Sequence, residues 1–149
     1  MRVADICSRD VACIEADASV REAALEMRRR HVGSLVVVDR RDAERVPRGI
    51  VTDRDLVVDV LAMDADAEAL TVADVMTRQP ITCNEHDSMY EAIDIMRVRC
   101  VRRLPVVGAR GQLTGLVSAN DLNSALGSCL RELAQVAPRS TAREAERRA

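Results

Sequence analysis

Two short segments of this 149-residue chain place a hydroxyl group three residues before a carboxylate. The segments are residues 49–56 (GIVTDRDL) and residues 115–122 (GLVSANDL). In the first, Thr52 precedes Asp55, and in the second, Ser118 precedes Asp121. This spacing is typical of a capping box, in which both side chains bind backbone groups at the start of a helix, where free N–H groups can also bind an anion. Each segment is therefore either a simple helix cap or a junction that can bind a ligand.

The two segments belong to a longer internal repeat. Residues 4–7 (ADIC) match residues 73–76 (ADVM), and the match continues at a constant offset of 69 residues. Beyond Arg41 the offset falls by three, because the polar loop 42–46 is longer than its counterpart at 111–112. The chain is a tandem duplication in which a glycine, a strand and an acid recur together at both junctions. This recurrence gives a ligand-binding role about the same weight as a cap alone, so both interpretations stay open.

Each half is predicted to fold as β-α-β-β-α. Ser19 and Glu22 form a capping box ahead of a helix with one apolar face, and Ser88 and Glu91 do the same in the second half. Runs rich in β-branched residues between turn-forming residues predict the strands. In the first half we expect strands near 12–14, at 35–38 and at 49–51, with helices from 20 and over about 53–63. In the second half we expect strands near 81–83, at 104–107 and at 115–117, with helices from 89 and over about 119–126.

A half of about 60 residues has a small core and leaves one sheet face uncovered. We therefore expect the halves to pack sheet to sheet with pseudo-two-fold symmetry, as a mixed α/β protein of the α+β type. The expected domains are 1–68 and 69–128, followed by a C-terminal extension at 129–149. Residues 130–136 are expected to add a helical turn or two, and the polar residues after them to be disordered.

A G-h-h-[ST]-x-x-D-h segment that closes each half of a duplicated β-α-β-β-α chain resembles the CBS domain pair, or Bateman module, of the stand-alone bacterial type. The resemblance covers residues 1 to about 126. In that family the Ser or Thr contacts a ligand phosphate, and the Asp binds the ribose hydroxyls of AMP, ATP or another adenosyl compound. The resemblance therefore implies one nucleotide site with Thr52 and Asp55, and another with Ser118 and Asp121, in the cleft between the repeats.

Further candidates lie where the earlier strands of each half begin. Arg102 and Arg103 resemble the phosphate-binding basic pair of nucleotide-sensing members such as the γ subunit of AMP-activated kinase. The alternative is that they are a solvated surface pair. Gly33 and Ser34 occupy the equivalent place in the first half. The nucleotide-binding set is completed by Ala12 and Ile81.

The composition argues against several other functions. All 22 basic residues are arginines, scattered among 24 acidic residues for a net charge of −2, so we expect no nucleic-acid partner. Tyr90 is the only aromatic residue, so aliphatic side chains would have to enclose a ligand's base. No apolar run reaches the roughly 18 residues of a membrane helix, and the start has no signal-peptide pattern. We expect no membrane partner and a cytoplasmic location.

The sequence also gives no pattern for catalysis, a metal or a cofactor. Five cysteines form no C-x-x-C pair and are expected to be buried, reduced thiols. His31 and His86 have no matching partners, and neither a P-loop nor a dinucleotide fingerprint is present. The expected function is a non-enzymatic sensor that binds an adenosine nucleotide, forms a homodimer and signals to an unknown regulated protein. The alternative is a constitutive interaction module without a nucleotide.

Overall fold

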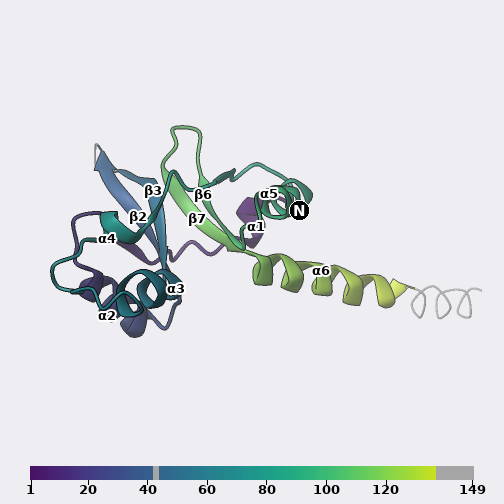
Figure 1. The fold of residues 1–149 in the computed structure, drawn as a ribbon. Helices are drawn as coiled ribbons and strands as arrows, with labels where there is room; N and C mark the ends of the chain where they lie inside the picture. Colours follow the sequence, from purple (N-terminus) through teal and green to yellow (C-terminus); the bar gives the residue numbers. More distant parts are fainter. Residues whose placement is uncertain (42–43, 137–149) are drawn as a thin grey trace, which may run out of the picture.

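The structure is a computed structural model that describes residues 1–41 and 44–136 (Figure 1). The tip of the expected polar loop, at 42–43, and the tail that we expect to be disordered, at 137–149, lie outside the described residues. The part of the loop that follows the tip is not a loop, because residues 44–46 already belong to a strand. The extra residues of the first half therefore lengthen its hairpin.

Both halves form the predicted β-α-β-β-α unit. The first unit contains β1 (Cys13–Glu15), α2 (Val20–Arg30), β2 (Ser34–Arg41), β3 (Glu44–Thr52), the short helix α3 (Asp53–Asp55) and the π-helical turns η1 (Leu56–Leu61). The second unit contains β5 (Cys83–Asn84), α5 (Met89–Arg99), β6 (Arg103–Val107), β7 (Leu113–Ser118) and α6 (Ala119–Ala134). The capping boxes predicted at Ser19 and Ser88 are confirmed, and they start α2 and α5.

The two sheets have the same topology. In each, the first strand pairs parallel with the second, and the second pairs antiparallel with the third. The helix between the parallel strands provides the crossover that parallel pairing requires. Both sheets carry a register shift at the same repeat position, at Val37/Val38 and at Val106/Val107. The pseudo-symmetry of the sequence therefore extends to the details of strand pairing.

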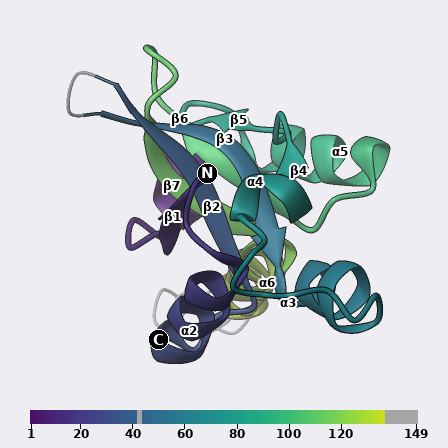
Figure 2. The same cartoon turned by 60° about the vertical axis from the view of Figure 1, so that its left-hand side comes forward.

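The segments that begin each repeat are exchanged between the units. The helix α1 (Val3–Ile6) packs on the second unit, where the backbone N–H of Val3 donates to the carbonyl of Asp87 at 2.8 Å. Its counterpart α4 (Val72–Val75) packs on the first unit, and the N–H of Val72 donates to the carbonyl of Ala18 at 2.8 Å. Figure 1 shows α1 beside α5, and Figure 2 shows α4 over the first sheet.

The strand after α4 makes the exchange visible in the sheet. β4 (Thr77–Arg78) joins the edge of the first sheet next to β3, which gives the strand order β1-β2-β3-β4. At the equivalent place Ser8 forms an isolated bridge with Leu116 of β7, beside a sheet of three strands, β5-β6-β7. The sequence prediction missed α1, α4 and β4, although the match of residues 4–7 with 73–76 marks their position.

Each unit has its own core, and a third cluster joins them. Val3 is fully buried in the core of the second unit, and Val72 is fully buried in that of the first. Between the sheets lies a cluster built from Val11, Val36 and Leu113, with Leu116 packed against it. In Figure 2 the strands of both sheets lie together in the centre of the molecule. The predicted sheet-to-sheet packing is confirmed.

Helix α6 is longer than the sequence prediction. It runs without a break through Gly127 to Ala134, where we expected an end near Leu126 and a separate turn or two of helix. A single glycine costs a helix only about 1 kcal/mol relative to alanine, and residues 119–137 contain no proline. Figure 1 shows the helix projecting from the body of the molecule.

Candidate functional site

The first junction lies where β3 ends and α3 begins. Thr52 is the N-cap residue, and its hydroxyl donates to Oδ2 of Asp55 at 2.7 Å. The Thr52 N–H donates to the same oxygen at 2.7 Å, and the Asp55 N–H donates back to the Thr52 hydroxyl at 3.3 Å. The capping-box interpretation is therefore correct for this pair.

The second junction repeats this geometry between β7 and α6. The Ser118 hydroxyl donates to Oδ2 of Asp121 at 2.6 Å, and the Ser118 N–H donates to it at 2.7 Å. The Asp121 N–H donates to the Ser118 hydroxyl at 3.3 Å. All four side chains are half-buried.

Capping uses only one oxygen of each carboxylate. Among the described residues, Oδ1 of Asp55 and Oδ1 of Asp121 accept no hydrogen bond. A carboxylate oxygen has two lone pairs, so each Oδ1 can accept from a ligand while Oδ2 keeps the helix start in place. The cap and the ligand site are therefore compatible functions of the same residues.

The strand starts lie beside these junctions. Ser34 pairs directly with Thr52 in the β2–β3 register, and Arg103 pairs directly with Ser118 in the β6–β7 register. One residue earlier, the carbonyl of Gly33 accepts from the N–H of Asp53 at 3.1 Å. The structure therefore brings both candidate pairs of strand-start residues to the junction of their own unit.

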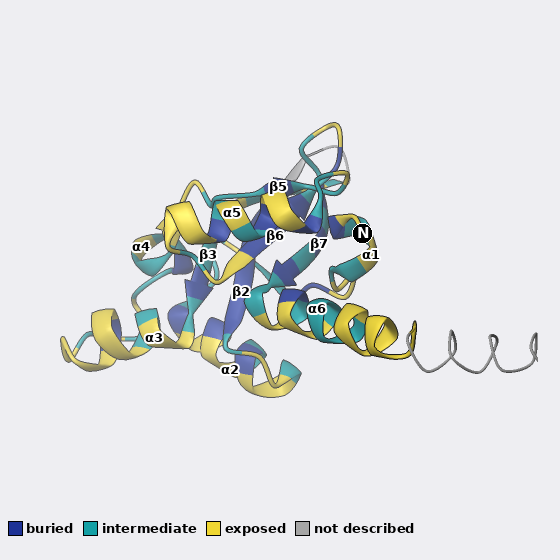
Figure 3. Cartoon of the chain, turned by 90° about the vertical axis from the view of Figure 1, so that its right-hand side faces the viewer, coloured by how far each residue is buried: buried dark blue, intermediate teal, exposed yellow. Residues whose placement is uncertain are grey.

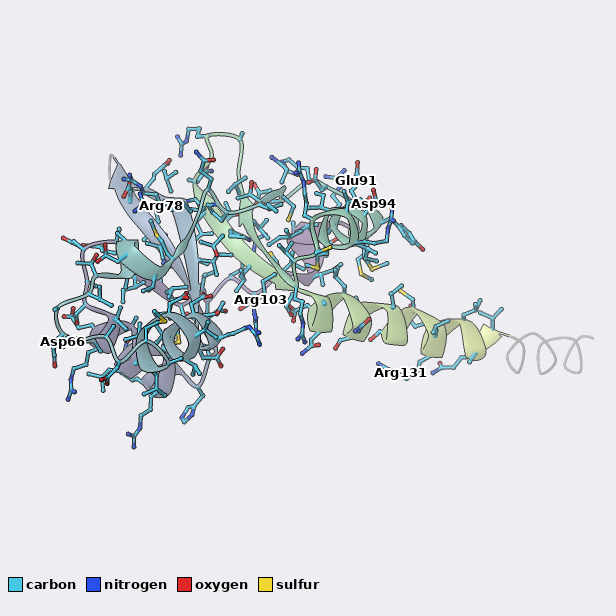
Figure 4. All side chains as sticks on the ribbon, viewed as in Figure 1. Asp66, Arg78, Glu91, Asp94, Arg103 and Arg131 are labelled. Atoms are coloured by element: carbon cyan, nitrogen blue, oxygen red, sulfur yellow. The ribbon has the colours of Figure 1, made fainter. Side chains whose placement is uncertain are left out.

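In the second unit the equivalent backbone hydrogen bond runs from the N–H of Ala119 to the carbonyl of Arg102, at 3.0 Å. Arg102 and Arg103 are both exposed, and neither forms an ion pair with a described residue. In the view of Figure 4, Arg103 is labelled between the helical segment of the first unit and the start of α6. The start of β6 thus carries two arginines without an ion-pair partner among the described residues, whereas the first unit has Gly33 and the buried Ser34 at this place.

The remaining candidates, Ala12 and Ile81, precede the first strand of their units. The Ala12 carbonyl accepts from the N–H of Val36 at 3.0 Å, two residues along β2 from Ser34. The residue equivalent to Val36 is Pro105, which has no N–H group. The corresponding hydrogen bond to Ile81 therefore cannot form, and the two units differ in backbone pairing beside their junctions.

The exchanged N-terminal segment reaches the second junction. Asp121 lines a shallow depression together with Met1, Asp5 and Ile6 from the start of the chain, and Ser124 from α6. Sequence analysis did not include these N-terminal residues in the candidate set. The internal repeat alone could not find them, because the exchange places them on the opposite half from their own repeat.

The cysteines differ in exposure, which corrects the expectation that all are buried. Cys83 is buried, whereas Cys100 and Cys129 are exposed. Burial raises the pKa of the Cys83 thiol to about 12.

Within residues 1–41 and 44–136, no group of three or more His, Cys, Asp and Glu side chains has a metal-binding arrangement. None of the helices in that part of the chain is long and apolar enough to cross a membrane.

The fold and the duplicated junction define a paired-repeat α+β module. The family model for the CBS domain matches the chain twice, over residues 3–61 and 72–128. The chain therefore belongs to the CBS domain family, and the resemblance noted from the sequence is confirmed.

Two relatives differ in how much of their own length this chain covers. An uncharacterized protein of Methanopyrus kandleri is 33% identical over 120 residues, which cover 80% of this chain and 60% of that protein. The CBS domain-containing protein YhcV of Bacillus subtilis is 30% identical over 137 residues, which cover 88% of this chain and 94% of YhcV. The chain thus spans less than two thirds of the first relative and nearly all of the second.

Three solved structures are similar. Protein PAE2072 of Pyrobaculum aerophilum, complexed with AMP, is 26% identical with a TM-score of 0.73, and the match covers 81% of this chain and 89% of that one. The CBS domain pair of protein MJ0100, in complex with 5′-methylthioadenosine and S-adenosyl-L-methionine, is 25% identical with a TM-score of 0.74, covering 86% and 97%. A hexameric CBS-CP12 protein from bloom-forming cyanobacteria is 25% identical with a TM-score of 0.72, covering 82% and 66%.

Proposed function

We propose that this protein is a non-enzymatic sensor that binds an adenosine-containing nucleotide at the two junctions and signals its presence to a partner protein. The observation that carries the proposal is the pair of carboxylates that keep one oxygen free while the other caps a helix. Related CBS pairs have been solved with AMP, and with 5′-methylthioadenosine and S-adenosyl-L-methionine. These ligands share an adenosyl group, which is the part that the common features of the junctions would recognise.

Oδ1 of Asp55 or Asp121 is suited to the ribose. The two hydroxyls of a ribose are neighbouring donors, and hydrogen bonds to a charged acceptor contribute roughly 1.5–3 kcal/mol each. Because Oδ2 is held by the N-cap residue, the carboxylate is fixed in orientation before the ligand arrives. A preoriented acceptor loses little side-chain freedom on binding.

The second junction is suited to AMP or ATP. Arg102 and Arg103 are exposed and have no ion-pair partner among the described residues, so binding a phosphate would break no salt bridge there. Guanidinium groups bind phosphate oxygens in a bidentate manner. The missing N–H at Pro105 leaves the Ile81 carbonyl without one backbone partner, and a carbonyl acceptor suits the exocyclic amino group of adenine.

The test of this function is calorimetry on the full chain with adenosine, AMP, ATP and S-adenosylmethionine, together with thermal unfolding at each ligand. A ligand at 100 times its dissociation constant stabilises the folded state by about 2.7 kcal/mol. We expect saturable binding of at least one of these compounds. Lack of binding by all four would contradict the sensor and support a constitutive interaction module whose acids only cap helices.

We further propose that the sensor is a homodimer. Exposed apolar side chains gather on the outer helices, and Figure 3 shows that the far half of α6 is exposed. Leu130, Leu133 and Val136 are 66%, 67% and 58% exposed. These three side chains form an apolar stripe, and residues 137–149 contain no large apolar side chain apart from Pro138. A second copy offers an identical stripe, as closed two-fold assembly requires.

Sedimentation at micromolar concentration tests the dimer. We expect the unaltered chain to sediment as a dimer, and the double variant Leu130→Glu/Leu133→Glu to sediment as a monomer. Gln135→Glu is the control, because it adds an acid at the C-cap of the same helix, on the opposite side from the stripe. A monomeric unaltered chain, or a double variant that remains dimeric, would contradict this arrangement.

A further inference from the structure

The two junctions differ in whether the strand-start residue or the first helix residue carries the long side chain. In each unit a carbonyl at the strand start accepts from the first N–H of the following helix: Gly33 pairs with Asp53, and Arg102 pairs with Ala119. The backbone geometry is therefore the same in both units. In the first unit the long side chain of this pair belongs to the helix residue, Asp53. In the second unit it belongs to the strand-start residue, Arg102.

In the observed conformation of Asp53 the two arrangements would compete for the same space. The carboxylate of Asp53 lies over Gly33, so a methyl group at Gly33 would come within 2.8 Å of its Oδ2. The other oxygen, Oδ1, accepts from the N–H of Arg54 at 2.8 Å, which holds the carboxylate in this orientation. In the second unit the residue at the strand start has a full side chain, and Ala119 has no carboxylate to oppose it.

This difference in side chains also inverts the sign of the charge beside the junction. The first unit carries two acids and one arginine there, namely Asp53, Asp55 and Arg54. The second unit carries two arginines and one acid, with Asn120 in the place of Arg54. The sign of the local charge is therefore opposite at two sites that share the same cap and the same strand pairing.

We propose that Asp53 sets the ligand class of the first site, where it repels phosphate groups and selects adenosyl compounds whose 5′ substituent is neutral or positively charged. This inference rests on the proposed nucleotide-binding function. The carboxylate stands against the backbone position that carries Arg102 in the second site, so it occupies the space from which that arginine would reach a phosphate. A sulfonium group, by contrast, would be attracted to it.

The test isolates the first site in a chain that carries Asp121→Gln, because glutamine can replace the acid of a capping box while removing the charged acceptor. In this background, calorimetry compares adenosine, AMP and S-adenosylmethionine with and without Asp53→Asn. Asparagine keeps an acceptor for the Arg54 N–H. The matched control is Asp66→Asn, which removes the same charge from the turn after η1, where the side chain accepts from the Glu68 N–H; Figure 4 labels Asp66 at the outer edge of the first unit.

We expect Asp53→Asn to raise the affinity for AMP about five- to tenfold and to lower that for S-adenosylmethionine by a similar factor, as a unit charge several ångströms away in a largely aqueous medium predicts. Adenosine should change by less than about twofold, and the effects should shrink in high salt because Asp53 is exposed. Asp66→Asn should change none of the three.

Two results would overturn the inference alone. One is that the Asp121→Gln chain binds adenosine but prefers AMP to it, and the other is that Asp53→Asn leaves the preference between AMP and S-adenosylmethionine unchanged. Failure of the Asp121→Gln chain to bind any of the three, while the unaltered chain binds AMP, would also overturn it. If the unaltered chain binds no adenosyl compound, the proposed function fails and this inference fails with it.

Discussion

The two strand-to-helix junctions are nearly identical in backbone and opposite in charge. Thr52 and Ser118 cap their helices with the same hydrogen bonds, and the distances agree to within about 0.1 Å. The side chains around them have diverged, since one junction is flanked by Asp53 and the other by Arg102 and Arg103. The duplicated fold thus supplies a common recognition geometry, and a few flanking positions determine what each copy would bind.

The largest expected effect separates the two carboxylates. Asp121→Gln should weaken AMP binding at least a hundredfold, about 2.7 kcal/mol, because it removes the charged acceptor from the arginine-bearing site. Asp55→Gln should leave most AMP binding intact. Calorimetry with AMP measures both, and thermal unfolding checks that glutamine preserves each cap. Equal losses from the two substitutions would refute the asymmetry between the sites.

The arginines should account for the next effect. Arg103→Ala should weaken AMP binding by roughly ten- to a hundredfold, or 1.5–3 kcal/mol, through the loss of a charge-assisted hydrogen bond. Adenosine, which has no phosphate, should bind nearly as well as before. Competition between the two ligands for the same chain gives this ratio directly. A penalty of the same size for adenosine would mean that Arg103 supports the fold of the site and not the phosphate.

The exchanged segments predict a comparison of stability. Val3→Ala and Val72→Ala should each lower the free energy of unfolding by about 2 kcal/mol, because both valines are fully buried. Val98→Ala, at a 62% exposed position, should change it by less than about 0.5 kcal/mol. Denaturant titration measures the size of each effect.

Amide exchange locates the same effects. Val3→Ala should raise the amide exchange rates of the second unit, and Val72→Ala should raise those of the first. If each substitution raised the rates in its own repeat, the swapped packing of α1 and α4 would be wrong.

The smallest expected effect, on the acid sensitivity of unfolding, should be the same in both halves. Hydrogen bonds from the backbone and hydroxyl of the N-cap serine lower the pKa of Glu22 and, at the equivalent place, of Glu91. A carboxylate with a lowered pKa adds stability above its unfolded pKa, and this stability is lost as the pH falls through its folded pKa. Glu22→Gln and Glu91→Gln should each make unfolding slightly less sensitive to acid below about pH 4.3. Urea titrations between pH 7 and pH 3 compare them, and a clear difference between the two would break the pseudo-symmetry of the helix starts.

Local sequence was sufficient to predict the repeat, the order of elements within each β-α-β-β-α unit and the caps, but not α1, α4 and β4. Ser19, Ser88, Thr52 and Ser118 each satisfy a helix start through a partner only three residues away, so the pattern is readable without tertiary information. The sequence also placed Arg103 in the same half as Ser118, whereas their direct pairing became visible only in the β6–β7 register.

Tertiary structure decided which half each segment completes and which side chains oppose each other. Nothing in residues 4–7 indicates that α1 covers the second unit, because its apolar residues would fit either core and only the packing of both units selects one. The close approach of the Asp53 carboxylate to Gly33 is likewise invisible in sequence, since the two residues lie 20 positions apart and meet through one backbone hydrogen bond. The sequence alone determined the helix caps, because their hydrogen bonds join residues only three positions apart, and long-range packing decided how the elements combine into two different sites.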